Sequence, residues 1–261
     1  TILLDKSMIL AFVLKKGSVN SHTAILARAM NIPALIQVPF SDDMEGSMAI
    51  VDGDKGKLFL DPDQDFLEEY TEEQNAEQEK QKILNQLKGK ETVTKGGRRI
   101  ELFANIGSGE DVDTVLENDG EGIGLFRSEF LYLGKEQLPS EEEQFQIYKN
   151  VAKRMGDKKV IIRTLDLGAD KQAPCFPMEK EENPAMGCRG IRLCLEHPKA
   201  FKSQLKAILR AGMYGNLSIM YPMITSIGEL GKIGEILQIA KQELQEEGKQ
   251  YKDLEQGIMV E

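Results

Sequence analysis

The stretch 198-PKAFKSQLKAILRAGMYGNLSIMYPMI-224 places a helix pattern directly before an apolar strand pattern. We predict the helix over 198–211 and the strand over 217–224. An earlier apolar run, 160-VIIRT-164, predicts another strand, and a loop rich in Gly and Pro separates it from the helix. A strand, a crossover helix and a second strand form the repeating unit of a parallel α/β sheet. This stretch therefore predicts an α/β fold.

The same alternation of strand and helix patterns extends in both directions from about residue 91 onward. Further strands are predicted at 100–105, 122–126 and 257–261, and further helices near 110–118, at 140–155 and at 226–247. Such a series fits either an open doubly wound sheet or the first half of a (β/α)8 barrel. Because the last strand pattern stops abruptly at Glu261, we expect the truncated barrel.

The residues before this series show two other patterns. Residues 1–62 contain short apolar runs and turns, which predict a small α/β unit with a strand at 8–14, a helix at 21–30 and a hairpin at 48–60.

In residues 61–90, acidic side chains crowd the first half and lysines the second, an order that suits the helix macrodipole. Its sparse apolar positions predict a mostly solvated linker helix over 63–90, although a surface helix of a single domain has the same pattern. We therefore expect domains at 1–62 and 91–261.

Composition narrows the classes of function. The 33 basic and 43 acidic residues give a net charge of −10, which argues against nucleic acid as a partner. The sequence has no run of 18 apolar residues, which argues against membrane insertion, and its three cysteines form no C-x-x-C pair. We expect a soluble cytoplasmic protein with reduced thiols. Because the chain opens at Thr1 and stops inside a strand pattern, we also expect a fragment of a longer protein.

Charged residues fall where the predicted strands end. Arg127 follows one strand, Arg163 closes the next along the chain, and Glu261 closes the last. In both candidate folds, ligands bind at the carboxyl ends of the strands. Arginine suits bidentate binding of phosphate or carboxylate, and a strand-end glutamate suits Mg²⁺. The alternative for each arginine is an ion pair with a neighbouring acid such as Glu129 or Asp166.

The loop at 166–190 is longer than most loops in a compact α/β domain, and loops of that length are usually functional or disordered. Lys171 and Arg189 lie in it and add two cations to the same strand ends.

One of the two histidines, His22, lies at the expected start of a helix, between Ser21 and Thr23. Free backbone N–H groups at a helix start favour an anion, and a histidine can act as a covalent nucleophile. A histidine with a core or capping role would fit the same position, and the pattern leaves both interpretations open. His197, just before Pro198, is expected to be structural.

Several stretches resemble known motifs. The stretch 17-GSVNSHTAILARAMNIPA-34 resembles the phosphohistidine signature of the enzymes that use phosphoenolpyruvate (PEP). Four others resemble barrel motifs of one branch, enzyme I of the sugar phosphotransferase system, in the order found in that branch: 122-GIGLFRSEFLYL-133, 163-RTLDLGADK-171, 183-NPAMGCRGIR-192 and 257-GIMVE-261.

This resemblance implies that His22 is phosphorylated by PEP with Mg²⁺ and passes the phosphoryl group to a histidine of the carrier protein HPr, the first step of sugar uptake. It implies part of a swivelling phosphohistidine domain, a linker helix and the first half of a PEP-binding (β/α)8 barrel, which in this branch usually forms a homodimer. Glu261 matches a Mg²⁺ ligand. The residues that match the cations around PEP are Arg127, Arg163, Arg189 and Lys171.

The sequence departs from the branch in two ways. The signature usually begins Gly-Gly-x-Thr-Ser-His, whereas this chain has 17-GSVNSH-22. The parts that in this branch dock HPr, supply a second metal carboxylate and protonate enolpyruvate fall outside residues 1–261, so we expect no complete catalysis by this chain alone. The alternatives are a pyruvate phosphate dikinase or PEP synthase, and a regulatory, nitrogen-related paralogue of enzyme I.

Overall fold

The structure is a computed structural model that describes residues 9–18, 23–24, 27, 32–39, 41, 44–168, 173–176, 181–183 and 186–260. The chain divides into two compact units, residues 1–87 and residues 88–261.

The smaller unit contains two pairs of short strands. Strands β1 (Phe12–Leu14) and β2 (Ala34–Ile36) pair in parallel, whereas β3 (Ala49–Asp52) and β4 (Lys57–Leu60) form an antiparallel hairpin. The hairpin confirms the prediction for 48–60. The strand expected at 8–14 is shorter than predicted, because the described residues before Phe12 are not in a strand.

Helix α2 (Gln64–Asn85) follows the hairpin in the same unit. Asp63 caps it by accepting a 2.8 Å hydrogen bond from the backbone of Phe66. The rings of Phe66 and Tyr70 pack against Phe59 of β4, with centroids 4.8 and 5.5 Å away. From residue 71 onward the described side chains of the helix are exposed. The helix is therefore packed at its N-terminal end and solvated beyond it.

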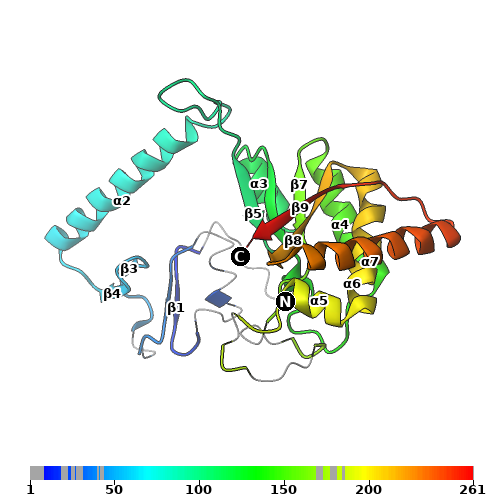
Figure 1. Cartoon of the computed structure of the whole chain (residues 1–261). Helices are drawn as coiled ribbons and strands as arrows, with labels where there is room; N and C mark the ends of the chain where they lie inside the picture. Colours follow the sequence, from blue (N-terminus) through cyan, green and yellow to red (C-terminus); the bar gives the residue numbers. More distant parts are fainter. Residues whose placement is uncertain are drawn as a thin grey trace. The chain divides into compact units, whose positions relative to one another are not determined.

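The larger unit is a parallel sheet with helices between its strands (Figure 1). Its strands are β5 (Phe103–Ile106), β6 (Gly122–Arg127), β7 (Val160–Arg163), β8 (Leu217–Ile224) and β9 (Glu255–Val260). Its α-helices are α3 (Asp111–Glu117), α4 (Glu141–Met155), α5 (Ile191–Glu196), α6 (Pro198–Ala211) and α7 (Ile227–Glu246). Two 3₁₀ turns, η3 (Ser128–Leu131) and η4 (Gly212–Tyr214), follow β6 and α6.

The strand order is sequential, β5-β6-β7-β8-β9, and every neighbouring pair is parallel. An open doubly wound sheet contains a point where the strand order reverses, and these strands contain none. Helices α4, α6 and α7 lie beside one another along one face of the sheet (Figure 1). This order is the one that the first half of a (β/α)8 barrel requires.

Apolar faces of these helices form the core with the sheet. Helix α4 begins with a capping box between Ser140 and Glu143, and Tyr148 on its inner face is fully buried. Helix α6 buries Leu205 and Ile208 in the same cluster. Full burial of one such aliphatic side chain contributes roughly 1.5–3 kcal/mol, so this layer fixes the sheet beneath it.

In the larger unit, β5 and α5 differ most from the sequence predictions. Strand β5 begins at Phe103 rather than residue 100, because the backbone N–H of Ile100 donates to Thr92 in a separate small hairpin. The short helix α5 is an element that the predictions missed, and the chain turns at His197 into α6.

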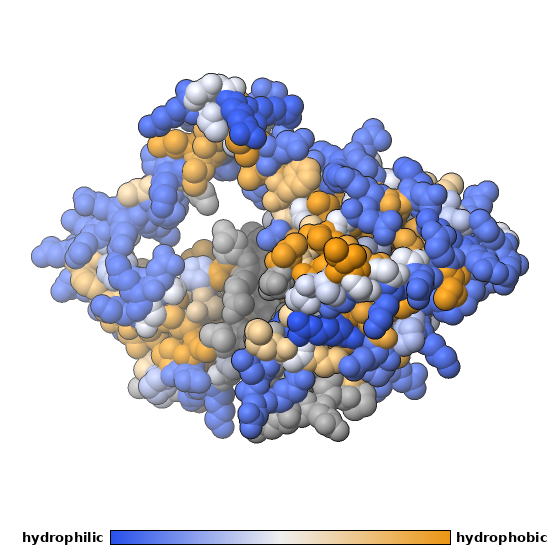
Figure 2. Space-filling view, viewed as in Figure 1, coloured by the Kyte–Doolittle hydropathy of each residue, from blue (hydrophilic) through white to orange (hydrophobic). Residues whose placement is uncertain are grey.

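Apolar side chains gather on the surface of the larger unit near β9 and α7 (Figure 2). Among the described strands β9 pairs only with β8, so it forms an edge of the sheet. The most exposed apolar side chains of β9 and α7 are Val260 and Ile227, at 76% and 86% exposed. Within the described ranges, no helix has the length and apolar character needed to cross a membrane.

Candidate functional site

Two arginines occupy neighbouring strand ends in the larger unit. Arg127 is the last residue of β6 and Arg163 the last of β7, and their Cα atoms are partners in the parallel register. Paired positions of adjacent strands project their side chains on the same side of the sheet. The structure therefore brings these two predicted site residues together at the carboxyl end of the sheet.

Arg163 is held by two carboxylates. One of its terminal nitrogens lies 2.8 Å from Oε1 of Glu129 in η3, and the other lies 3.0 Å from Oδ2 of Asp166. Glu129 is fully buried and Arg163 is 7% exposed. Charges this deeply buried persist only when they are paired. The alternative that the sequence left open, an ion pair with a neighbouring acid, thus holds for Arg163.

Asp166 also connects this pair to Arg189. Its Oδ1 lies 3.5 Å from a terminal nitrogen of Arg189, although 23 residues separate the two in the chain. The next residue, Gly190, has a φ of +55°, and a Cβ there would lie 3.2 Å from the same Oδ1. Glycine at this position therefore lets the returning loop approach Asp166 closely. The third predicted cation, Arg189, belongs to the same cluster.

Arg127 has a different environment. Its guanidinium group lies 4.9 Å from the ring centroid of Phe130, and it forms no ion pair with any residue that the structure describes. Phe130 in turn packs over Gly107, where a Cβ would lie 3.1 Å from the ring. Within the same described ranges, the buried Nε atoms of Arg127 and Arg163 have no hydrogen-bond partner.

Within the described part of the chain, the cluster contains more guanidinium groups than carboxylates. Arg127, Arg163 and Arg189 supply three guanidinium groups, whereas Glu129 and Asp166 supply two carboxylates. Guanidinium groups bind phosphate and carboxylate oxygens in bidentate geometry. The cluster can therefore bind a small anion with several oxygens.

Three predicted site residues, His22, Lys171 and Glu261, lie outside the described residues. Near the first of them, Thr23 and Ala24 are helical. Val260, which precedes Glu261, pairs with Ile224 of β8.

No metal site is visible in the described part of the chain. Among those residues, no group of three or more His, Cys, Asp and Glu side chains is arranged to hold a metal ion. The carboxylates closest to the arginines, Glu129 and Asp166, are already in ion pairs. The described residues therefore do not by themselves fit a Mg²⁺ ion.

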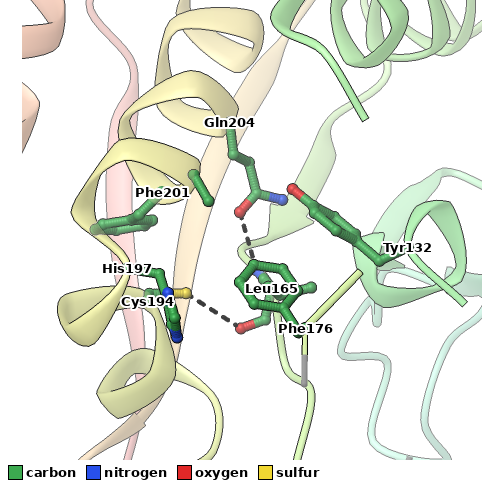
Figure 3. A pocket seen from close by; sticks show the side chains of 8 residues that line it. Tyr132, Leu165, Phe176, Cys194, His197, Phe201 and Gln204 are labelled. Carbon is green, nitrogen blue, oxygen red and sulfur yellow. Dashed lines mark hydrogen bonds between the residues drawn. The ribbon is translucent and has the colours of Figure 1, made fainter. Parts of the chain in front are cut away.

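A small, mainly apolar pocket lies between the strand ends and α6 (Figure 3). His197 lines it and packs edge-on against Phe176, with ring centroids 5.2 Å apart. The sulfur of Cys194 lies 3.6 Å from the carbonyl oxygen of Leu165, and burial raises the pKa of this thiol well above its ordinary value. Apolar and aromatic side chains thus form most of the lining of this pocket.

One residue near the arginines was missed by the sequence analysis. Gln204 is fully buried and lies on the apolar face of α6, between Phe201 and Ile208. A polar side chain on an otherwise apolar helix face must find hydrogen-bond partners inside the protein. A glutamine on the apolar face of the predicted helix is the signal from which Gln204 could have been found.

Comparison with known proteins gives two family matches. Residues 81–261 match the PEP-binding domain of the PEP-utilising enzymes, and residues 1–56 match the mobile domain of the same enzymes.

Individual relatives match along the whole chain. Proteins named phosphoenolpyruvate-protein phosphotransferase are 46% identical in Priestia megaterium, 44% in Bacillus subtilis (strain 168) and 43% in Staphylococcus epidermidis. Each comparison covers 100% of this chain and 46% of the relative. The chain thus spans about half the length of these curated relatives.

Proposed function

The chain belongs to the family of PEP-utilising enzymes, and on this premise we propose that it carries the phosphohistidine and part of the PEP site of an enzyme I. The names of the matched relatives support this proposal. On this proposal, the protein is cytoplasmic, it acts in the first step of sugar uptake, and its barrel forms a homodimer.

The observation that carries the proposal is the cluster of Arg127, Arg163 and Arg189 at the carboxyl ends of β6 and β7. Guanidinium groups gathered at neighbouring strand ends suit a ligand that bears both a phosphate and a carboxylate. Arg127 forms no ion pair with any described residue, so its charge is available to the ligand without displacing an acid.

In the proposed reaction, the neutral imidazole of His22 attacks the phosphorus of PEP through Nε2. The new N–P bond forms as the bond from phosphorus to the enol oxygen breaks. The enolate leaves and takes a proton on its methylene carbon to give pyruvate. A histidine nitrogen of HPr then attacks the same phosphorus, and the N–P bond to His22 breaks. The arginines bind PEP and offset the charge on its oxygens during the first transfer.

Mg²⁺ belongs to the proposal only through residues outside the described part of the chain. We propose Glu261 as one of its ligands and Lys171 as a further cation beside the phosphate. A bound Mg²⁺ would neutralise charge on phosphate oxygens. The carboxylates of Glu129 and Asp166 are paired with Arg163, so we do not propose them as ligands of the ion.

The residue that receives the phosphoryl group can be tested in the full-length protein. After incubation with PEP labelled on phosphorus, we expect acid-labile, base-stable label in the wild type and in His197→Ala, the other histidine of the chain. His22→Ala should remain unlabelled. Label that persists in His22→Ala would contradict the proposal, and labelling of His22 by ATP would place the protein in the dikinase branch.

The PEP site can be tested in the 261-residue chain by calorimetric titration with PEP. Loss of one charged hydrogen-bonding partner typically costs about 1.5–3 kcal/mol, so Arg127→Ala should weaken binding by roughly ten- to a hundredfold. Arg154→Ala is the matched control, because Arg154 pairs with Asp113 and the carbonyl of Gly109 and has no contact with the arginine cluster among the described residues. Equal affinities for the two variants would contradict the assignment.

A further inference from the structure

We infer that Gln204 is a positioning residue that fixes the two arginine-bearing strand ends relative to each other. The role in PEP binding rests on the proposed function, whereas the positioning itself does not. Gln204 lies on α6, is fully buried and bonds to Leu165 after β7 (Figure 3). It also bonds to Ser128, which directly follows β6.

The hydrogen bonds of Gln204 use its whole amide. Its Oε1 accepts from the backbone N–H of Leu165 at 3.0 Å, and its Nε2 donates to the hydroxyl of Ser128 at 2.9 Å and to that of Tyr148 at 3.2 Å. Because Leu165 N–H can only donate, the amide oxygen must face it, and the amide NH₂ must face the two hydroxyls. The orientation of the side chain is thus determined by its partners.

The first two of these bonds reach the arginines. Ser128 follows Arg127 directly, and its hydroxyl donates at 2.7 Å to the backbone carbonyl of Arg163. Leu165 is two residues past Arg163. One amide therefore ties the side chain of Ser128, next to Arg127, to the backbone of Leu165, and Ser128 in turn holds the carbonyl of Arg163.

The third bond leads away from the strand ends. The hydroxyl of Tyr148 donates to Oε1 of Gln144 at 3.5 Å, and the hydroxyl of Tyr132 donates to the same oxygen at 2.9 Å. Burial raises the pKa of both tyrosines, so their hydroxyls keep their protons. This branch connects helices, and it provides a control in the same buried network.

The first experiment compares three variants of the chain without ligand. Gln204→Met removes every bond of the amide at nearly constant volume. Ser128→Ala removes the hydroxyl that joins Gln204 to the carbonyl of Arg163. Tyr148→Phe removes the bond from Gln204 to Tyr148 and leaves the bonds of Gln204 to Ser128 and Leu165 in place. The measurement is the NMR spectrum of the arginine Nε–H groups. We expect the signals of Arg127 and Arg163 to shift and broaden in the first two variants, and to stay unchanged in Tyr148→Phe.

The second experiment measures PEP affinity of the same variants. We expect Gln204→Met and Ser128→Ala to bind PEP on the order of tenfold more weakly, because the guanidinium groups of Arg127 and Arg163 would be displaced from their binding positions. Tyr148→Phe should match the wild type. In an Arg163→Ala background, Gln204→Met should weaken binding much less, because the group that it positions is gone.

The outcomes separate the two proposals. If Gln204→Met only lowers the melting temperature, as Tyr148→Phe does, and leaves the arginine signals unchanged, the positioning role is refuted. If the wild-type chain fails to bind PEP while the arginine signals respond as expected, the proposed function fails and the role of Gln204 stands.

Discussion

The ion pair between Arg163 and Glu129 allows a direct measurement of what burial adds to a hydrogen-bonded charge pair. The chain offers a matched pair with the same chemistry, because Arg210 lies 2.8 Å from Glu142, the same distance as Arg163 from Glu129. The side chain of Glu129 is 0% exposed and that of Glu142 is 58% exposed. The perturbation is Glu→Gln at each site, which removes the charge and keeps the shape.

The expected costs differ by several fold. Removal of one partner of a buried pair costs about 3–5 kcal/mol, because the other charge stays buried. Since Arg163 keeps its ion pair with Asp166 and the glutamine oxygen can still accept a hydrogen bond, we expect about 2–3 kcal/mol for Glu129→Gln. An exposed pair contributes about 0.2–1 kcal/mol, which is our expectation for Glu142→Gln.

The assay is urea unfolding of the chain, followed by near-ultraviolet circular dichroism of its buried tyrosines, since the chain contains no tryptophan. The midpoint should fall markedly for Glu129→Gln at an unchanged m-value, and slightly for Glu142→Gln. The melting temperature should fall by roughly 4–12 °C for Glu129→Gln, from about 2–4 °C per kcal/mol. Equal losses for the two variants would refute the reasoning that burial makes the first pair indispensable.

Three further predictions concern a pair of glycines, Glu247 and Phe130. Gly190→Ala should destabilise the chain by about 1–3 kcal/mol in thermal unfolding, because Gly190 has a φ of +55°. Gly231→Ala is the opposite case: Gly231 lies within α7 with open space around it, and this substitution should stabilise the chain by about 0.5–1 kcal/mol. Hydrogen bonds from two lysines lower the pKa of Glu247 from 4.5 to about 2, so its contribution to stability is complete above pH 4.5 and is lost as the pH falls toward 2. The melting temperature of Glu247→Gln should therefore depend less on pH in that window than that of the wild type. Phe130→Ala should weaken PEP binding about two- to fivefold, as expected for loss of a cation–π contact with Arg127, with little change in thermal stability because Phe130 is 47% exposed.

The sequence was sufficient for those elements whose periodicity is long and regular. Strand β8 and helices α4 and α6 were predicted within a residue of their bounds, because their apolar positions recur over many residues. The six-residue helix α5 was missed, because a segment that short has less than two full turns of periodicity. The predicted start of β5 at residue 100 was wrong. The backbone N–H of Ile100 donates to Thr92 in a local hairpin, and the sequence pattern does not reveal this partner.

The site was predictable in its placement and not in its contacts. A strand-end position is a property of the local pattern, and that was enough to bring Arg127 and Arg163 to one edge of the sheet. Whether Arg163 meets an acid depends on side-chain positions in η3 and the following loop, which no spacing rule determines. Gln204 is 76 residues from its partner Ser128, so only the folded chain reveals that bond.

The carboxylates around Arg163 have a consequence for ligand selectivity. A singly charged ion such as chloride or acetate gains little from an arginine that two internal acids already neutralise. A multiply charged ligand can engage Arg127, Arg163 and Arg189 at once, and its gain then exceeds the loss of any one internal contact. Arg163 should therefore add affinity for multiply charged ligands and little affinity for small monoanions.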